Sequence, residues 1–323
     1  MKRNWKLAVV FMAIFIFAGA TISYAFTEAS NDTNYTINTP YQYPLTAGTD
    51  EWGALMNHAE KVDLCQIPED ILSLMTTEAL AETVLSYPLL LDMYVWDSTT
   101  TGYKVIAATF NGLAELERRP DGLSTLKELS QQTLRTRDDP FFTRNLETII
   151  REMSGLRKSA QNDQFESVTL FTPSGSPVLA YKDLTWADHN TTFQNAKQEQ
   201  NQILNQYKST VLLGNVSPAY NCHSYAWYKQ STNNQYWISN PKKYMEDGSY
   251  KNTTEWTTSA KVYYDNSWLA QIEGEQPYHY DHSGIALVSK NTIRSKWGYN
   301  ALFEHNIADS PYYFSFTNLY LFK

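Results

Sequence analysis

The sequence has little cysteine, with only Cys65 and Cys222 in 323 residues. Two cysteines exclude a disulfide-rich scaffold and a four-cysteine zinc site. Basic residues are also few, because 26 Lys and Arg stand against 34 Asp and Glu, for a formal net charge of −8. This balance argues against a nucleic-acid-binding protein, which normally has a basic face. No glycine loop of the kind that cradles phosphate is present, so we expect no nucleotide site and no cofactor.

Glycine and proline are scarce as well, at 13 and 12 residues, and charged residues make up 19% of the chain. These values exclude a collagen-like or wholly disordered protein. Hydrophobic residues at 42% are ample for a sizeable core. Aromatic residues are abundant, with 23 Tyr and 9 Trp, and about half of them follow residue 219. That distribution indicates a strand-rich core with a binding surface in the last third.

Residues 1–25 are typical of a secretory signal peptide. Basic residues within the first six positions precede an apolar run at 7–20, and small side chains at Ser23 and Ala25 predict cleavage after Ala25. As a helix this run would span about 21 Å, short of a hydrocarbon core of about 30 Å, so we expect no stable membrane anchor. The mature protein is therefore expected to be secreted, outside the cell or at the cell wall. A thiol in that compartment is either paired or reactive.

The rest of the chain divides by its patterns into three stretches. Residues 26–50 are rich in Thr, Asn and Ser and predict a flexible leader. Residues 51–160 carry apolar residues at helical spacing and predict a helical domain, whose expected role is that of a scaffold or a binder of a protein partner. Residues 161–323 combine short β-rich runs with turns and one helix. The expected fold class is α+β.

Cys222 lies where the sequence predicts the start of a helix. Pro218 and Asn221 favour a turn before it, and Ala226 favours helix after it. Backbone N–H groups at a helix start stabilise a thiolate and lower its pKa, and they can hold an oxyanion. A cysteine nucleophile also needs an imidazole base and a third group that orients the base.

Two histidines on predicted strands are candidates for these roles. His282 begins a strand, and Gly284 behind it permits close backbone approach. The strand at 301–305 ends in His305, and a histidine on a neighbouring strand can bond the far nitrogen of the first imidazole. We therefore expect Cys222 as nucleophile, His282 as base and His305 as orienting residue.

The order of a helix-starting Cys222, a strand at 261–264 and His-Ser-Gly-Ile-Ala from His282 resembles the papain-like NlpC/P60 and CHAP cysteine hydrolases. The resemblance implies a papain-like domain over 161–323, with Cys222 as nucleophile and His282 as base. It also implies a peptide or cell-wall substrate, cleaved at an amide bond.

Several features depart from the NlpC/P60 pattern. The third catalytic residue of that family falls near Ser295 or Lys296, but lysine accepts no hydrogen bond and serine orients weakly, so His305 is preferred. His-Ser follows Cys222 where the family has Ser-Gly, and an insert rich in Asn, Thr and Trp precedes His282. Separately, segments 65–70, 83–88, 221–227 and 295–298 resemble secreted proteins of Gram-positive bacteria with a similar helical half, a likeness that implies no activity.

Other interpretations stay open at this point. Cys222 can pair with Cys65 in a disulfide, which would leave a non-enzymatic secreted binding protein on a degenerate hydrolase fold. The same thioester can serve a transferase, and a toxin or inhibitor would use the helical half. His282 can be a surface histidine, and His223 can be exposed or lie beside the site on another helix face. His279, Asp281 and His282 lack the spacing of a zinc site, so no metal is expected.

Overall fold

The structure is a computed structural model that describes residues 35–136, 139–155, 165–184, 190–269, 281–314 and 317–323. The expected signal peptide lies outside the described residues. Thr36–Lys323 form one compact unit of mixed helix and sheet, in agreement with an α+β class. Among the described residues, no helix combines the length and the hydrophobicity that crossing a membrane requires.

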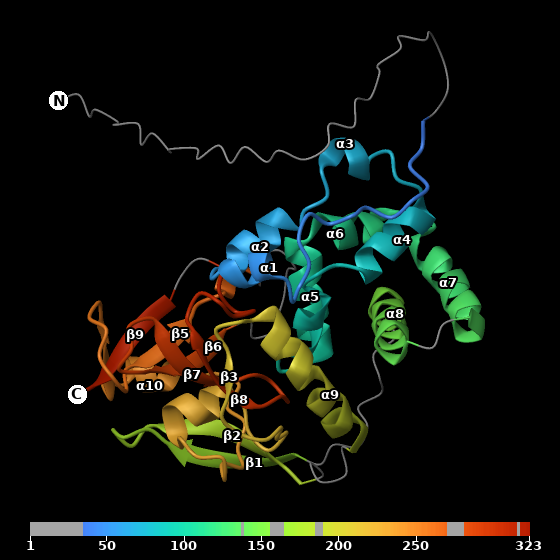
Figure 1. The fold of residues 1–323 in the computed structure, drawn as a ribbon. Coiled ribbons are helices and arrows are strands. Elements are labelled where there is room, and N and C mark those ends of the chain that lie inside the picture. Colours follow the sequence, from blue (N-terminus) through green and yellow to red (C-terminus); the bar gives the residue numbers. More distant parts are fainter. Residues whose placement is uncertain (1–34, 137–138, 156–164, 185–189, 270–280, 315–316) are drawn as a thin grey trace, which may run out of the picture. The chain divides into compact units, whose positions relative to one another are not determined.

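The first part of the chain is helical, as its apolar spacing predicts (Figure 1). Its elements are α1 (Asp50–Ala54), α2 (His58–Leu64), α3 (Glu69–Leu72), α4 (Thr77–Leu85), the 3-10 helix η1 (Leu90–Tyr94), α5 (Thr99–Thr109), α6 (Asn111–Arg118), α7 (Gly122–Thr136) and α8 (Pro140–Met153). Local capping fixes several starts: the Thr76 hydroxyl accepts from the N–H of Ala79 before α4, and the Asp139 carboxylate caps α8. Pro140 then occupies the first turn of α8, where its missing N–H costs nothing.

The last residues of the expected leader, 26–50, pack on the helices. Ile37 exchanges backbone hydrogen bonds of 2.8 Å with Leu74 and Thr76. Tyr41 and Tyr43 are half-buried against the core. The prediction of a flexible segment is therefore wrong from residue 36 onward, since its aromatic side chains bury apolar area against α4.

The second part contains a hairpin, one long helix and an antiparallel sheet, drawn from green to red in Figure 1. Its elements are β1 (Phe165–Phe171), β2 (Pro177–Asp183), α9 (Asn190–Gln206), β3 (Val211–Leu212), the π-helix η3 (Ser224–Tyr228), α10 (Lys242–Glu246), β4 (Tyr250–Thr253), β5 (Lys261–Tyr264), β6 (His282–Ala286), β7 (Thr292–Lys296), β8 (Leu302–Asn306) and β9 (Thr317–Phe322). The seven-stranded sheet has the order β3-β8-β7-β6-β5-β9-β4.

The two faces of this sheet pack against different neighbours. Ala286, Ile293 and Phe303 on one face share a core with the helices of the first part. On the other face, Ile285 and Leu302 pack against the aromatic residues of η3. Because side chains alternate along a strand, His282 lies on the face of Ala286, and its neighbour Ser283 lies on the face of η3. His282 and Ser283, at the start of β6, therefore face different layers.

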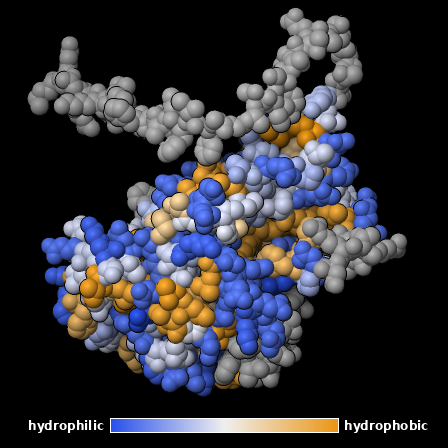
Figure 2. Space-filling model, viewed as in Figure 1, coloured by the Kyte–Doolittle hydropathy of each residue, from blue (hydrophilic) through white to orange (hydrophobic). Residues whose placement is uncertain are grey.

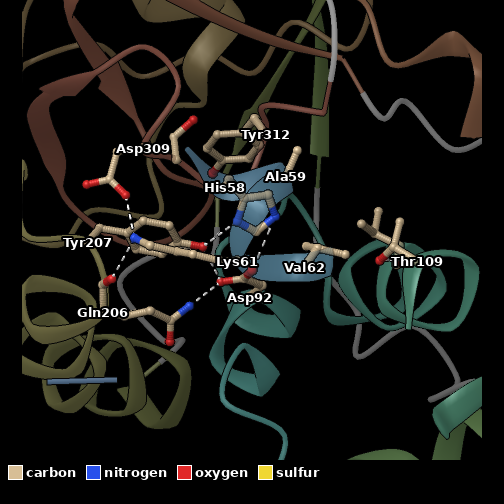
Figure 3. Close-up of polar contacts among 12 residues, drawn as sticks. His58, Ala59, Lys61, Val62, Asp92, Thr109, Gln206, Tyr207, Asp309 and Tyr312 are labelled. Carbon is tan, nitrogen blue, oxygen red and sulfur yellow. Dashed lines mark hydrogen bonds and ion pairs between the residues drawn. The ribbon is translucent and has the colours of Figure 1, made fainter. Parts of the chain in front are cut away.

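A buried ion pair joins α2 to the segment after β8 (Figure 3). Nζ of Lys61 lies 2.6 Å from Oδ1 of Asp309, and both side chains are 0% exposed. The same Nζ donates to the carbonyl oxygen of Gln206 at 3.2 Å, and Oδ2 of Asp309 accepts from the N–H of Ser209. One ammonium group thus links three parts of the chain that are far apart in sequence, at residues 61, 206 and 309.

A second polar group, built around Asp92, lies beside this pair (Figure 3). Oδ1 of Asp92 accepts from the Tyr207 hydroxyl and from Nε2 of Gln206, both at 2.6 Å. Nε2 of His58 lies 3.7 Å from Oδ2. Burial raises the pKa of Asp92 to about 7 and lowers the pKa of His58 to about 3. Both side chains are therefore mostly neutral near pH 5.

These two shifts predict opposite slopes of stability against pH. Folded Asp92 holds a proton that the unfolded chain has lost between about pH 4 and 7, so its effect on the unfolding free energy falls as pH rises. The unfolded chain binds a proton on His58 that the folded chain lacks between about pH 3 and 6.5, so that effect rises with pH. Asp92→Asn removes the first effect alone. We expect urea unfolding from pH 4.5 to 6 to give the variant a slope more positive than wild type by about 1.4 kcal/mol per pH unit. Equal slopes would contradict the raised pKa of Asp92.

Candidate functional site

Cys222 lies at the start of the short helix that continues as η3, where the sequence predicts a helix start. Oδ1 of Asn221 accepts from the N–H of Ser224 at 3.1 Å and so caps this turn. The turns of η3 have π-helical hydrogen bonding. This bonding is rare in proteins as a whole, and where it occurs it is often at a functional site. Asn221 therefore fixes the place at which the cysteine enters the helix.

The thiol of Cys222 is buried, with 2% of the residue exposed. Its sulfur accepts hydrogen bonds from the backbone N–H groups of Ser283 and His223. Burial, followed by the nearby charge of Asp97, raises the pKa of the thiol well above its usual value, although these two N–H groups and Lys296 oppose the shift. The expected lowered pKa is therefore wrong for this structure, because desolvation outweighs the hydrogen bonds at the helix start.

Both cysteines are free. Cys65 follows the last residue of α2 and is also buried, and burial raises the pKa of its thiol to about 12. The structure thus contains no disulfide between Cys65 and Cys222. The binding-protein interpretation required that disulfide to inactivate the Cys222 thiol, and it now lacks this support.

His282 begins β6, as predicted, and its ring is buried between aromatic side chains. Its centroid lies 3.5 Å from that of Tyr312, with the rings nearly parallel at 4°, and 5.5 Å from that of Tyr264. The interpretation as a surface histidine is therefore wrong. Burial, with smaller contributions from His223, His305 and Lys296, lowers the pKa of His282 well below its usual value. The imidazole is therefore neutral at pH 7, and its protonated form is disfavoured in this environment.

One nitrogen of this imidazole is unused. Nε2 of His282 is buried and has no hydrogen-bond partner among the described residues. It therefore does not bond the thiol of Cys222, yet the sulfur bonds the N–H of Ser283, the next residue along the chain. The thiol and the imidazole thus both lie at the start of β6, and Nε2 makes no hydrogen bond to the sulfur. Catalytic hydrogen bonds are often long before a substrate binds, so this geometry does not remove the pair as a candidate.

His305 does not orient His282 through a hydrogen bond. Its Nε2 lies 2.8 Å from the Ser295 hydroxyl, and its Nδ1 lies 2.8 Å from the carbonyl oxygen of Asn306. Burial lowers the pKa of His305 to about 4. Strand pairing explains the outcome, because His305 lies opposite Ile293 on β7, and β7 separates it from β6. Ser295, the alternative third residue, is thus the partner of His305.

Two charged groups that shift the pKa of the Cys222 thiol, Asp97 and Lys296, were not predicted to act on it from the sequence. Oδ2 of Asp97, from the helical part, accepts from Nδ2 of Asn221 at 3.0 Å. Nζ of Lys296 is fully buried, donates to the carbonyl oxygen of Gly298 at 2.5 Å and has its pKa lowered to about 7 by burial. No local pattern signals Asp97, since it lies 124 positions before Asn221. The sequence indicated Lys296 as a position near the site, but not that it is buried and lowers the pKa of the Cys222 thiol.

His223, the residue after Cys222, is buried. His223 is 1% exposed, so it is not a surface residue, and its Nδ1 lies 2.8 Å from the Ser283 hydroxyl. It therefore supports the start of β6 beside the thiol.

Of the three residues considered for a metal site, His279 lies outside the described residues. In the part of the chain that the structure describes, no three His, Cys, Asp or Glu side chains are grouped so as to hold a metal ion.

Thiol labelling tests the resting state of both cysteines. We expect neither to react rapidly with a disulfide reagent in the native protein at pH 7, because each is at most 2% exposed and burial raises both pKa values. Two thiols per chain should react at once in denaturant without reductant. A rapid native thiol at pH 7 would contradict the burial of Cys222, and a count below two in denaturant would indicate a disulfide.

Comparison with known proteins finds no relative of the chain. No family model matches the chain, and neither the curated proteins nor the solved structures contain a match.

Proposed function

We propose that the chain is a secreted cysteine hydrolase that cleaves amide bonds through a thioester on Cys222, with His282 as base and then acid. One observation carries the proposal. The sulfur of Cys222 accepts N–H bonds from Ser283 and His223 at the start of β6, the strand whose first residue, His282, has a buried imidazole with no partner for Nε2 among the described residues. Buried polar atoms are nearly always paired, so an unused one on the residue before Ser283 favours a chemical role.

The proposed chemistry follows from these groups. Neutral His282 takes the thiol proton as the sulfur attacks the amide carbonyl carbon. The N–H groups of Ser283 and His223, which bond the sulfur in this structure, are the proposed donors to the oxyanion. The C–N bond breaks, and the amine leaves with the proton from His282. Water, deprotonated by His282, then hydrolyses the thioester to a carboxylic acid and returns the thiol.

Burial sets a condition on this reaction. Cys222 and His282 are each 2% exposed, so the proposed activity requires a conformation that admits a substrate. The neutral resting pair also differs from the thiolate–imidazolium pair of an open papain-type site. The proposed enzyme is therefore at rest in this conformation. Cell-wall peptides are the proposed substrates, on the resemblance to NlpC/P60 and CHAP hydrolases.

The same burial favours a second candidate, a non-enzymatic secreted binding protein on a hydrolase-like fold. In that case the thiol and the imidazole are core residues, and the raised pKa of Cys222 reflects a site that never opens.

Product analysis separates the candidates. The chain lacking residues 1–25 is incubated with soluble cell-wall peptides, and new amino termini are counted by mass spectrometry. We expect cleavage in ¹⁸O-labelled water to place one ¹⁸O in each new carboxylate. Conjugation to an added amine without ¹⁸O uptake would indicate a transferase, and an unchanged peptide pool would support the binding protein.

A further inference from the structure

A large cavity lies along α9, formed by parts of the chain other than the Cys222 site. It has a volume of about 710 Å³, within the range of small-molecule pockets. Its walls come from residues 40–47, the segment after α4, the start of α8 and the end of α9. A second cavity of about 260 Å³ shares Phe141 and Gln202 with it, so the two adjoin. We call the pair the α9 groove, and Figure 2 shows orange hydrophobic side chains in the hollow above the blue surface of α9.

Carboxamides follow the groove along α9. Asn195, Gln198, Gln202 and Asn205 line one or both cavities. Their spacing of three, four and three residues places them on one side of a helix. Each carboxamide offers a donor and an acceptor, as a hydroxyl does. The helix thus presents a row of uncharged hydrogen-bonding groups to whatever lies in the groove.

Two further carboxamides of the larger cavity are almost fully buried. Asn145 is 2% exposed, and its Oδ1 accepts from the Tyr94 hydroxyl at 2.8 Å. Gln206, also 2% exposed, donates Nε2 to Asp92 at 2.6 Å. Both residues line the cavity, so they add carboxamide groups to its lining.

Aromatic rings form the opposite wall. Tyr41 and Tyr43 are half-buried, with ring centroids 5.3 Å apart and planes at 86°. Phe141 is half-buried where the two cavities meet. Such rings offer flat apolar surfaces beside the polar row of α9.

The charge of the lining disfavours an anionic ligand. Among the residues that line the larger cavity, none is Lys, Arg or His. Its two acids are Glu82 and Asp139, and the Asp139 carboxylate is already used as the cap of α8. The smaller cavity includes Arg144, whose guanidinium is already paired with Glu199 of α9. No described strand lines either cavity, so an extended peptide would find no strand edge to pair with.

We propose that the α9 groove binds a neutral oligosaccharide. A sugar ring has an apolar C–H face, which fits Tyr41 and Phe141, and a rim of hydroxyls, which fits the carboxamides. The two adjoining cavities accommodate a chain longer than a single sugar. This inference does not depend on hydrolysis at Cys222.

Calorimetric titration tests it, with Cys222→Ala protein lacking residues 1–25. The probes are the β-1,4-linked hexamers of glucose and of N-acetylglucosamine, and we expect saturable binding of at least one. Gln202→Ala with Asn205→Ala should weaken that binding about 10-fold or more, through two lost hydrogen bonds. Gln194→Ala with Asn201→Ala is the matched control, since both residues are exposed on α9 but outside the groove, and it should leave affinity unchanged.

Each other outcome overturns the proposal. Absence of saturable binding for both hexamers would show that the ligand is not one of these oligosaccharides and would overturn the proposal. Equal affinities of the two double variants would show that the sugar does not bind in the α9 groove. Binding of a mixed-sequence peptide pool in place of either sugar would show that the occupant is a peptide. Thermal melting of both double variants confirms that any lost affinity does not come from unfolding.

Discussion

Replacing Cys222 with alanine is expected to abolish amide cleavage, with a loss in kcat of at least about 1000-fold. The proposed reaction passes through a thioester, and alanine offers no nucleophile. The same change removes a sulfur that accepts two backbone hydrogen bonds, from Ser283 and His223. A moderate loss of stability is therefore expected as well, about 1–3 kcal/mol, and it must be measured beside the activity.

Two variants separate chemistry from folding. Cys222→Ser keeps an acceptor for both N–H groups and should restore most of the stability, but it should stay inactive because a buried hydroxyl is a far weaker nucleophile than a thiol. Cys65→Ala is the matched control, since Cys65 is the other buried free cysteine and has no part in the proposed reaction. It should keep full activity per folded molecule. Cleavage by Cys222→Ala at the wild-type rate would disprove the mechanism.

Much of the sheet was predictable from local pattern. Strands expected at 261–264 and 301–305 appear as β5 and β8, and His282 begins β6 as expected. These runs alternate in burial or are enriched in β-branched and aromatic residues, which is a short-range signal. The order of the strands needs pairing partners far apart in sequence, and β9 lies between β4 and β5 without any local sign of it.

Helices were predictable where a cap and an apolar face coincide. Thr76 caps α4 where the sequence indicates a start, and Leu85 ends it. Apolar residues at helical spacing continue to Met75, but α3 covers only Glu69–Leu72. The apolar segment after Pro88 forms the 3-10 helix η1 instead of an α-helix. Short helices depend on packing more than on propensity, so their lengths and types could not be read from pattern alone.

The chemistry of the site depended on burial, which local sequence does not encode. The helix start at Cys222 was predictable from Asn221, but the raised thiol pKa was not. It follows from groups delivered by other elements, among them Asp97 and Lys296. The role expected for His305 failed for a similar reason, because its partner Ser295 lies on the strand between the two histidines.

The largest effect on stability is expected from Lys61→Met. Removing this ammonium leaves Asp309 buried with its charge unpaired, and it also removes a donor from the carbonyl oxygen of Gln206. Breaking a fully buried pair on one side typically costs about 3–5 kcal/mol. Nζ of Lys61 also lies 5.1 Å from the ring centroid of Tyr207, so methionine loses a cation–π contact as well. Urea unfolding at pH 7 measures the loss.

A double variant shows whether the cost comes from the unpaired charge. Lys61→Met with Asp309→Asn removes both charges and keeps an acceptor for the N–H of Ser209, so it should be more stable than Lys61→Met alone. Arg118→Met is the control for loss of a cation, because Arg118 is 76% exposed beside Glu115 and exposed pairs contribute little. We expect it to leave the unfolding free energy essentially unchanged. If Lys61→Met were as mild as Arg118→Met, or if the double variant were the less stable of the two Lys61 variants, the ion pair would not be what joins α2 to the segment after β8.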